Sequence, residues 1–355
     1  MRSPLTILAG DRARDIIRDE GIRPERVRII SGAAGGPKWL VLAALDRLIF
    51  GHWLRPTRDP IHLIGSSIGS WRFAALLQQD GEARHRALEH AYIHQCYQGI
   101  PTPAEVTARC TGIVDAALPD SNVEALLTQS QFALHIATAR GRHLLNRQAD
   151  RLFYGGAAAA VVSNAVHRNL LGLHFRRTYF HHAGMPPPFR AVAGFSAEAV
   201  PLTPRNTKAA LLASGSIPTV LAGVGPIPDA PRGLYWDGGV VDYHLDLPYD
   251  VDEDELILYP HFSSRITPGW FDKFLPWRRS TPAWMRNVVL VAPSPGFVSS
   301  LPLGRIPDRD DFKRFFGRDA ERIAAWEATV EQCGVLDEAF LAAAAGAPDQ
   351  VGELV

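Results

Sequence analysis

The sequence predicts an α/β protein built on a mainly parallel sheet that is covered by helices. Between residues 27 and 80 the chain reads as strand, glycine-rich turn, helix, strand, glycine- and serine-rich turn, and helix. This alternation is typical of parallel strands joined by crossover helices. A second observation is the continuous apolar run at 256–259, which is typical of a strand buried on both faces. Functional loops are expected where the parallel strands end.

The composition is that of an ordinary globular protein, with 355 residues of which 46% are hydrophobic. The 37 basic and 37 acidic side chains balance, so no global field attracts nucleic acid and no such partner is expected. Three widely spaced cysteines form no metal or disulfide pattern and indicate a reducing compartment. No apolar stretch reaches the ~18 residues of a membrane span, and no secretory signal is recognisable. We therefore expect a cytoplasmic protein.

The first half of the chain alternates helices and strands. Residues 8–20 predict an amphipathic helix, and the β-branched run at 27–30 predicts a strand. An apolar helix over 39–50 follows the glycine-rich turn, and then come a strand at 61–64 and a helix at 71–77. Residues 81–130 read as mainly helical, and weak alternation over 132–139 predicts a strand.

The second half is less regular. The alanine-rich stretch 146–171 predicts a helix, whereas 178–190, with His181, His182 and three prolines, predicts a loop. A helix begins at Thr207 and breaks at Pro218. Residues 263–306 read as irregular and 309–345 as helical, so we divide the chain into an α/β domain, 1–262, and a part, 263–355, that packs on the same domain.

The most informative motif is Gly65-Ser66-Ser67-Ile68-Gly69, which fits G-x-S-x-G between an expected strand and an expected helix. In a nucleophile elbow the serine occupies a strained backbone conformation, so that its hydroxyl projects from the turn. The residues two before and two after the serine nearly touch, which requires very small side chains such as those of Gly65 and Gly69. The alternative is a turn in which glycine and serine have no chemical role.

The glycine-rich turn over residues 31–38 matches no phosphate-binding pattern, because Pro37 and Trp39 occupy positions where a P-loop needs glycine and Ser/Thr. Small residues at the start of a helix leave outward-pointing backbone N–H groups that can hold negative charge. Acyl transfer needs such donors for the oxyanion of its tetrahedral intermediate, and each is worth about 3 kcal/mol. A turn with only a packing role is the alternative.

A third motif, Asp237-Gly238-Gly239, lies 170 residues beyond Ser67. Asp-Gly between apolar runs is typical of a β-hairpin, and from these residues alone the hairpin is the favoured interpretation. Two glycines after an aspartate also let the backbone turn closely and direct the carboxylate into a cleft. A serine nucleophile needs a base within about 2.6–3.2 Å, and burial makes an aspartate a better base by raising its pKa.

The three motifs occur in the order found in the patatin-like phospholipase family, which the sequence therefore resembles. That family combines an oxyanion loop G-G-G-x-[K/R]-G with a G-x-S-x-G serine and a D-G-[G/A] aspartate. The corresponding segments here are 34–38, 65–69 and 237–239, and the segment 213–221 is similar to the S-x-x-x-P segment that precedes the aspartate in the family. The resemblance covers about residues 27–260.

The resemblance implies a three-layer α/β/α sandwich that hydrolyses lipid acyl esters with a Ser–Asp dyad, without a metal or an organic cofactor. Carried over to this chain, Ser67 is the nucleophile and Asp237 is the base. Gly35 and Gly36, together with the Lys38 backbone, would form the oxyanion hole. The implied partner is a lipid or another acyl ester.

Two other functions remain open at this point. His244 follows Ser67 and Asp237 in the chain order of an α/β-hydrolase triad, which predicts an esterase that depends on histidine. The chain also departs from the family pattern at two positions. Ala34 replaces the first glycine of the loop, and Trp39 replaces the glycine that follows the basic residue in the family. These departures leave room for a non-catalytic lipid- or protein-binding relative of the same fold.

Two further segments carry notable side chains. The acidic residues of one segment favour a solvated face over a calcium site, because the EF-hand spacing is missing; they are Asp242, Asp246, Asp250, Asp252 and Asp254. Residues 270–279 mix aromatic and basic side chains, as segments at a lipid interface do. Peripheral membrane contact would involve Trp270, Phe271, Phe274 and Trp277. Packing of these rings inside the protein is the alternative.

Overall fold

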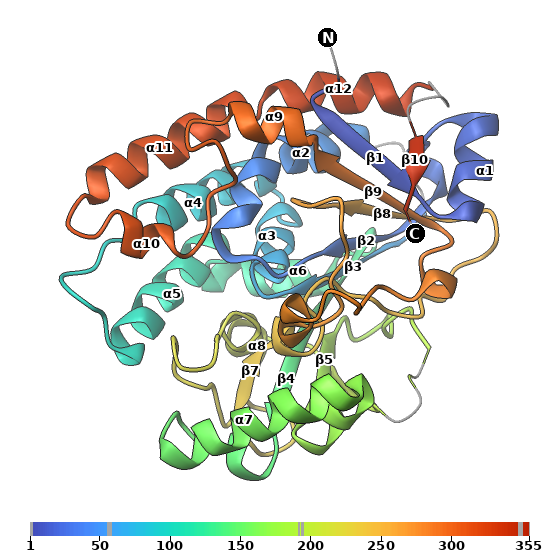
Figure 1. Ribbon diagram of the computed structural model, residues 1–355. Coiled ribbons are helices and arrows are strands. Elements are labelled where there is room, and N and C mark those ends of the chain that lie inside the picture. Colours follow the sequence, from blue (N-terminus) through green and yellow to red (C-terminus); the bar gives the residue numbers. More distant parts are fainter. Residues whose placement is uncertain (1–2, 55–58, 191, 193–194, 347–350, 355) are drawn as a thin grey trace.

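The computed structural model describes residues 3–54, 59–190, 192, 195–346 and 351–354. The chain is an α/β protein with one ten-stranded sheet, mixed but mostly parallel, and with helices packed against it (Figure 1). The strand order is β10-β1-β9-β8-β2-β3-β4-β5-β6, and β7 pairs with β4 outside this path. The α/β class predicted from the alternation of elements is confirmed.

Five neighbouring strands form the parallel centre of the sheet. In spatial order they are β9 (Val288–Pro293), β8 (Leu256–Pro260), β2 (Val27–Gly32), β3 (Ile61–Ser66) and β4 (Phe132–Gly141). They are rich in β-branched and aliphatic residues and almost entirely buried, as expected for parallel strands covered on both faces. The turns after β2 and β3 therefore lie side by side at one edge of the sheet, because Gly32 pairs with Gly65.

Antiparallel pairing appears on both sides of this centre. On one side β1 (Leu5–Ala9) runs antiparallel to β9, and β10 (Val351–Glu353) runs parallel to β1. On the other side β5 (Phe175–His181) runs antiparallel to β4, and β6 (Ala197–Pro201) runs parallel to β5. The short strand β7 (Tyr235–Asp237) also runs antiparallel to β4. This last pairing brings Asp237 to the sheet edge where β3 ends.

The α-helices of the described ranges are α1 (Asp11–Glu20), α2 (Ala43–Leu48), α3 (Ile68–Leu76), α4 (Gly81–Ile93), α5 (Pro103–Ala117), α6 (Val123–Thr128), α7 (Arg151–Val166), α8 (Thr207–Ser214), α9 (Pro295–Ser300), α10 (Asp311–Arg314), α11 (Asp319–Gln332) and α12 (Val335–Ala344). Figure 1 shows α11 and α12 along the top of the molecule and α7 along the bottom. None of the helices described is long and apolar enough to cross a bilayer.

The buried apolar side chains form two clusters. The larger one lies around the parallel strands and the helices on either side of them. The smaller one lies between α7 and the strands β4, β5 and β7, and it contains Phe153, Phe175 and Trp236. The second cluster matters for function because α7 lies on the outside of it and, as described below, also borders the main pocket.

Three sequence-based predictions of local structure are wrong. Residues 178–181 belong to β5 and not to a loop, because pairing with β4 and β6 outweighs the turn-forming residues that follow. Residues 8 and 9 end β1, and the first helix begins at Asp11. The segment 263–306 is not wholly irregular, since it supplies β9 to the sheet and contains α9.

The acidic segment is also not a solvated face throughout. Asp242 and Asp246 are each only 2% exposed. Asp242 accepts hydrogen bonds from Arg177 at 2.8 Å and from the Tyr179 hydroxyl at 2.7 Å. Asp246 accepts the backbone N–H of Thr281. A carboxylate can be buried only with such partners, and these lie far from it in the sequence.

Candidate active site

Ser67 lies at the apex of a tight strand–turn–helix. β3 ends at Ser66, α3 begins at Ile68, and Ser67 between them has φ 55° and ψ −128°, a conformation rare for a residue with a side chain. A Cβ atom on Gly65 would lie 2.4 Å from the Ser70 Cα, and one on Gly69 would lie 2.1 Å from the Gly32 carbonyl oxygen. Both motif glycines are therefore required by close backbone approach, as the G-x-S-x-G pattern predicts.

Hydrogen bonds hold the strained serine in place. Its backbone N–H donates to Ser214 Oγ at 2.9 Å, and Ser214 in turn donates to the Ala137 carbonyl at 2.7 Å. The Ser70 hydroxyl donates to the Ser67 carbonyl at 2.7 Å. Ser214 ends α8, so it ties the elbow to an element nearly 150 residues away. The sequence pointed to this segment only through its resemblance to the S-x-x-x-P stretch.

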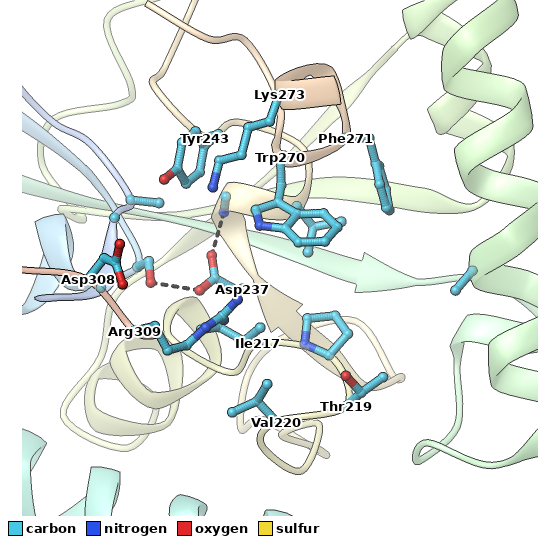
Figure 2. Close-up of a pocket in the computed structure, with 18 of the residues that line it drawn as sticks. Ile217, Thr219, Val220, Asp237, Tyr243, Trp270, Phe271, Lys273, Asp308 and Arg309 are labelled. Atoms are coloured by element: carbon cyan, nitrogen blue, oxygen red, sulfur yellow. Dashed lines mark hydrogen bonds between the residues drawn. The ribbon is translucent and has the colours of Figure 1, made fainter. Parts of the chain in front are cut away.

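The structure brings Ser67 and Asp237 together. Ser67 Oγ donates a hydrogen bond to Asp237 Oδ2 at 2.7 Å, and the other carboxylate oxygen accepts the Gly239 N–H at 2.6 Å (Figure 2). Asp237 is 5% exposed. Burial raises its pKa to about 6, against the opposing effect of the hydrogen bonds from Ser67 and Gly239. A carboxylate with a raised pKa in this position is a better proton acceptor than an exposed aspartate.

The hairpin interpretation of Asp237-Gly238-Gly239 is wrong, because a short 3-10 turn, Gly238–Val240, follows β7. A Cβ on Gly238 would lie 2.3 Å from the Ala137 carbonyl oxygen, and one on Gly239 would lie 2.7 Å from the Ala34 Cβ. The two glycines therefore let the aspartate turn pass close to β4 and to the glycine-rich turn. Their role is to bring Asp237 near Ser67.

The glycine-rich turn after β2 lies next to the serine. Gly35 and Gly36 border the same pocket as Ser67, and their N–H groups donate to no acceptor within the described ranges. Gly36 has φ 56°, which favours glycine, and a Cβ on Gly35 would lie 2.5 Å from the Phe262 ring. The Lys38 N–H, the third predicted oxyanion donor, instead lies 3.5 Å from the Gly35 carbonyl oxygen.

Ala34 and Trp39, which differ from the oxyanion-loop pattern of the family that the sequence resembles, both have structural roles. Ala34 donates its N–H to the Tyr243 carbonyl at 2.9 Å, so this residue fixes the loop and is not a free donor. Trp39 is 1% exposed and packs edge-on against His85 and Tyr92 in the core. It does not line the pocket that holds Ser67.

The pocket above Ser67 and Asp237 has a volume of about 400 Å³. Most of its walls are apolar side chains from α7, from the β5 region, from the turn after α8 and from the 3-10 turn Trp270–Phe274. They include Leu145, Phe153, Phe175, Ile217, Val220, Trp270 and Phe271. A pocket of this size and lining accommodates an apolar ligand of modest length. None of these walls was predicted, because they come from five separate parts of the chain.

Three basic side chains gather at the same pocket. Lys38, Lys273 and Arg309 all border it, and none of them forms an ion pair with any part of the chain that the structure describes. Figure 2 shows the Arg309 guanidinium beside Asp237 and the Lys273 side chain reaching toward the space above it. Partial desolvation lowers the pKa of both lysines. The neighbouring Asp308 is already paired with Arg314 at 3.0 Å.

His244 does not take part in this arrangement. Its Nδ1 accepts the Thr267 N–H at 2.9 Å, and its ring stacks on Tyr243 with a centroid distance of 4.3 Å. Burial holds its pKa well below the ordinary value, so the ring is neutral. Both oxygens of Asp237 are bonded elsewhere, and His244 forms no described hydrogen bond with Ser67 or Asp237.

Replacing His244 with glutamine is therefore expected to change kcat/KM for a small acyl ester by less than about threefold. Glutamine keeps an acceptor for the Thr267 N–H, so the packing change is small. A triad would instead lose about 10⁶-fold on removal of its histidine. Steady-state hydrolysis of p-nitrophenyl butyrate measures the difference, with His261→Gln as a control for the loss of a neighbouring buried ring.

In the described residues, no group of three or more His, Cys, Asp or Glu side chains is arranged to hold a metal ion. His181 and His182, the adjacent pair in the sequence, form no such group. Comparison of the sequence with models of known families and with curated proteins found no match. The assignment of a function therefore depends on the geometry around Ser67.

Proposed function

We propose that the protein is a serine hydrolase that cleaves lipid acyl esters with a Ser67–Asp237 dyad. The observation that carries this proposal is the 2.7 Å hydrogen bond from a strained serine to a buried aspartate at the base of an apolar pocket. Serine is a weak nucleophile unless a base takes its proton, and Asp237 is the group placed to do so. Besides a nucleophile and a base, acyl transfer needs donors that stabilise the negative charge of the oxyanion, and the unpaired N–H groups of Gly35 and Gly36 can supply them.

In the first half-reaction the ester carbonyl carbon lies next to Ser67 Oγ. As Oγ attacks, its proton passes to Asp237 Oδ2, and the carbonyl oxygen becomes an oxyanion held by the N–H groups of Gly35 and Gly36 and by that of Ile68. Collapse of this intermediate breaks the bond to the alcohol oxygen. The leaving alcohol takes the proton from Asp237, and the acyl group stays on Ser67.

In the second half-reaction a water molecule attacks the acyl-serine. Asp237, again ionised, accepts a proton from this water, and the same N–H groups hold the second oxyanion. Ser67 Oγ leaves and regains the proton, so that the net products are a fatty acid and an alcohol. The chemistry uses only this chain's residues and water.

Two features of the pocket support a lipid with an acidic head group as substrate. The apolar walls suit an acyl chain. Lys38, Lys273 and Arg309 are positioned to attract a phosphate or carboxylate next to the ester. A phospholipid or lysophospholipid provides both parts, and a neutral acylglycerol provides only the first.

We further propose that the fold is a three-layer α/β/α sandwich of the patatin-like type. The support is the order of three motifs and what each does locally: a glycine turn after β2, a serine elbow after β3 and an aspartate at the end of β7. The dyad without histidine is consistent with the same type. Two residues differ from the family's loop pattern. Ala34 fixes the turn through its backbone hydrogen bond, and the side chain of Trp39 fills the core.

Labelling with a fluorophosphonate tests the proposal, because only an activated serine reacts quickly. We expect stoichiometric labelling of the native protein, with the modified peptide carrying the phosphonyl group on Ser67, and no labelling of heat-denatured protein. Native protein that remains unlabelled would instead favour a non-catalytic lipid- or protein-binding relative. Peptide mass spectrometry identifies the modified residue.

The rate is expected to depend on pH through Asp237. The carboxylate must be ionised to accept the serine proton, and its pKa is about 6. For a neutral ester, kcat/KM should therefore be level above about pH 7 and fall tenfold for each pH unit below about 6. A histidine with an ordinary pKa would give a profile centred near the same pH. The measurement is therefore repeated in His244→Gln, where the profile should be unchanged.

A further inference from the structure

Helix α7 exposes an apolar surface that a water-facing helix does not usually have. In the described residues thirteen large apolar side chains are exposed, and seven of them lie between residues 144 and 173. Five of the seven are on α7, namely Leu152, Tyr154, Val161, Val162 and Val166. The other exposed positions after Arg151 are glycine or alanine. We call this outward half of the helix the α7 face.

The inner half of α7 is apolar as well. Phe153 and Ala160 belong to the smaller buried cluster, and Phe153 and Ala157 line the pocket above Ser67. A helix that is apolar all round is normally buried in a protein core or in lipid. Here the protein covers only one half, while Val162 and Val166 remain 65% and 74% exposed. No described residue of the chain covers the α7 face.

Basic side chains lie near both ends of α7. Residues 140–190 contain eight arginines and one acidic residue, Asp150. Five of the arginines form ion pairs with acidic side chains, and three form none with any described residue, namely Arg142, Arg151 and Arg176. Arg147 and Arg151 stand at the start of the helix and are solvent-accessible. At its other end, Arg278 donates to the Asn164 carbonyl at 2.8 Å, and this contact brings the exposed Arg279 to the helix. An apolar surface between basic residues complements an anionic lipid surface.

The aromatic segment predicted to contact lipid adjoins α7 and divides into two parts. Trp270 and Phe271 border the pocket above Ser67 and are half-buried. Phe274 and Trp277 are 69% and 67% exposed. Their turn is fixed against α7 because the buried Asp272 accepts hydrogen bonds from Asn164 and Arg168.

We propose that the α7 face, with Phe274 and Trp277 beside it, docks on an anionic lipid bilayer. This inference rests on the proposed function, because the helix that would enter the interface is also a wall of the pocket where an acyl chain would bind. Docking would place the pocket wall at the level of the lipid esters. The acyl chain could then pass from the bilayer along Phe153 without crossing bulk water.

A second copy of the chain is the main alternative occupant. A symmetric dimer would place each α7 face on its counterpart. It would also bring the two arginine-rich segments together, and the like charges would oppose association. The same arginines favour a surface of acidic head groups, and each contributes about fivefold to binding. The charge distribution therefore favours the bilayer.

Sedimentation with vesicles tests the proposal. The protein would carry Ser67→Ala so that no lipid is consumed, and the vesicles would be phosphatidylcholine with or without phosphatidylglycerol. We expect binding to the anionic vesicles, at least tenfold weaker binding when Val162 and Val166 are both changed to glutamate, and a similar loss for Arg147→Gln with Arg151→Gln. Ile100→Glu, at a solvent-exposed loop position, is the matched control and should bind normally.

The contrary outcomes are distinct. Unchanged sedimentation of both double variants would overturn the proposal, as would equal binding of all variants to neutral vesicles. A dimer in analytical ultracentrifugation that dissociates on Val162→Glu would assign the α7 face to a second copy. Because binding is measured without turnover, it is independent of the dyad. A failed proposal for function would appear instead as no fluorophosphonate labelling of Ser67.

Discussion

Changing Asp237 to asparagine is expected to lower kcat/KM for acyl esters by about 10³-fold while leaving the fold intact. Asparagine has the same shape and can still accept the Gly239 N–H, so the turn after β7 is preserved. It cannot take a proton from Ser67 at neutral pH, and the nucleophile loses its base. Labelling of Ser67 by a fluorophosphonate should slow in parallel, because that reaction also needs an activated hydroxyl.

Asp246 provides the matched control for this change. It is as deeply buried as Asp237, and burial raises its pKa to about 6 as well, but it binds Thr281 away from the pocket. Asp246→Asn should therefore keep its activity within about threefold. If both variants lost activity equally, the effect would come from the loss of a buried charge and not from a base at Ser67.

The parts of the site that could be predicted are contiguous in the sequence. The serine elbow is such a part, because its strand, its turn and its helix follow one another within residues 61–76. The glycine-rich turn is another, since small residues between a strand and a helix have few structural explanations. Alternation of strands and helices also predicted the parallel centre of the sheet. The elbow, the turn and the parallel strands each depend on local steric requirements, and these requirements determine which residue types occur there.

The position of Asp237 could not be derived in this way. It reaches Ser67 because β7 pairs with β4, opposing Asp237 and Thr138, while β4 pairs with β3, opposing Ala137 and Ser66. No local pattern records these two pairings, and the sequence Asp-Gly-Gly by itself favours a hairpin. Only the order of motifs in a known family suggested the dyad.

The pocket walls and the buried charges were missed for the same reason. Trp270 and Phe153 line the same pocket above Ser67 although more than 100 residues separate them in the sequence. From the sequence alone Asp242 belongs to an acidic surface segment, whereas in the structure it is buried and accepts hydrogen bonds from Arg177 and Tyr179. The composition of a segment shows whether it is acidic or aromatic, but it does not show which distant segments pack against it.

Gly69→Ala is expected to destabilise the protein by about 3 kcal/mol and to abolish activity. The added Cβ would lie 2.1 Å from the Gly32 carbonyl oxygen and 3.0 Å from that of Ala33. Both atoms belong to the backbone at the end of β2, which cannot move without disturbing the central sheet. Relief of the clash would separate the serine elbow from the glycine-rich turn, and so Ser67 from the proposed oxyanion donors.

Gly112→Ala, in the middle of α5, separates this clash from the general effect of removing a glycine. Nothing lies within 4 Å of a Cβ at Gly112, so alanine should stabilise that helix by about 0.5–1 kcal/mol. Urea denaturation followed by circular dichroism measures both changes. Equal stability of the two variants would mean that β2 and α3 do not approach as closely as the geometry requires. The elbow would then not be held against the donors on which the proposed chemistry depends.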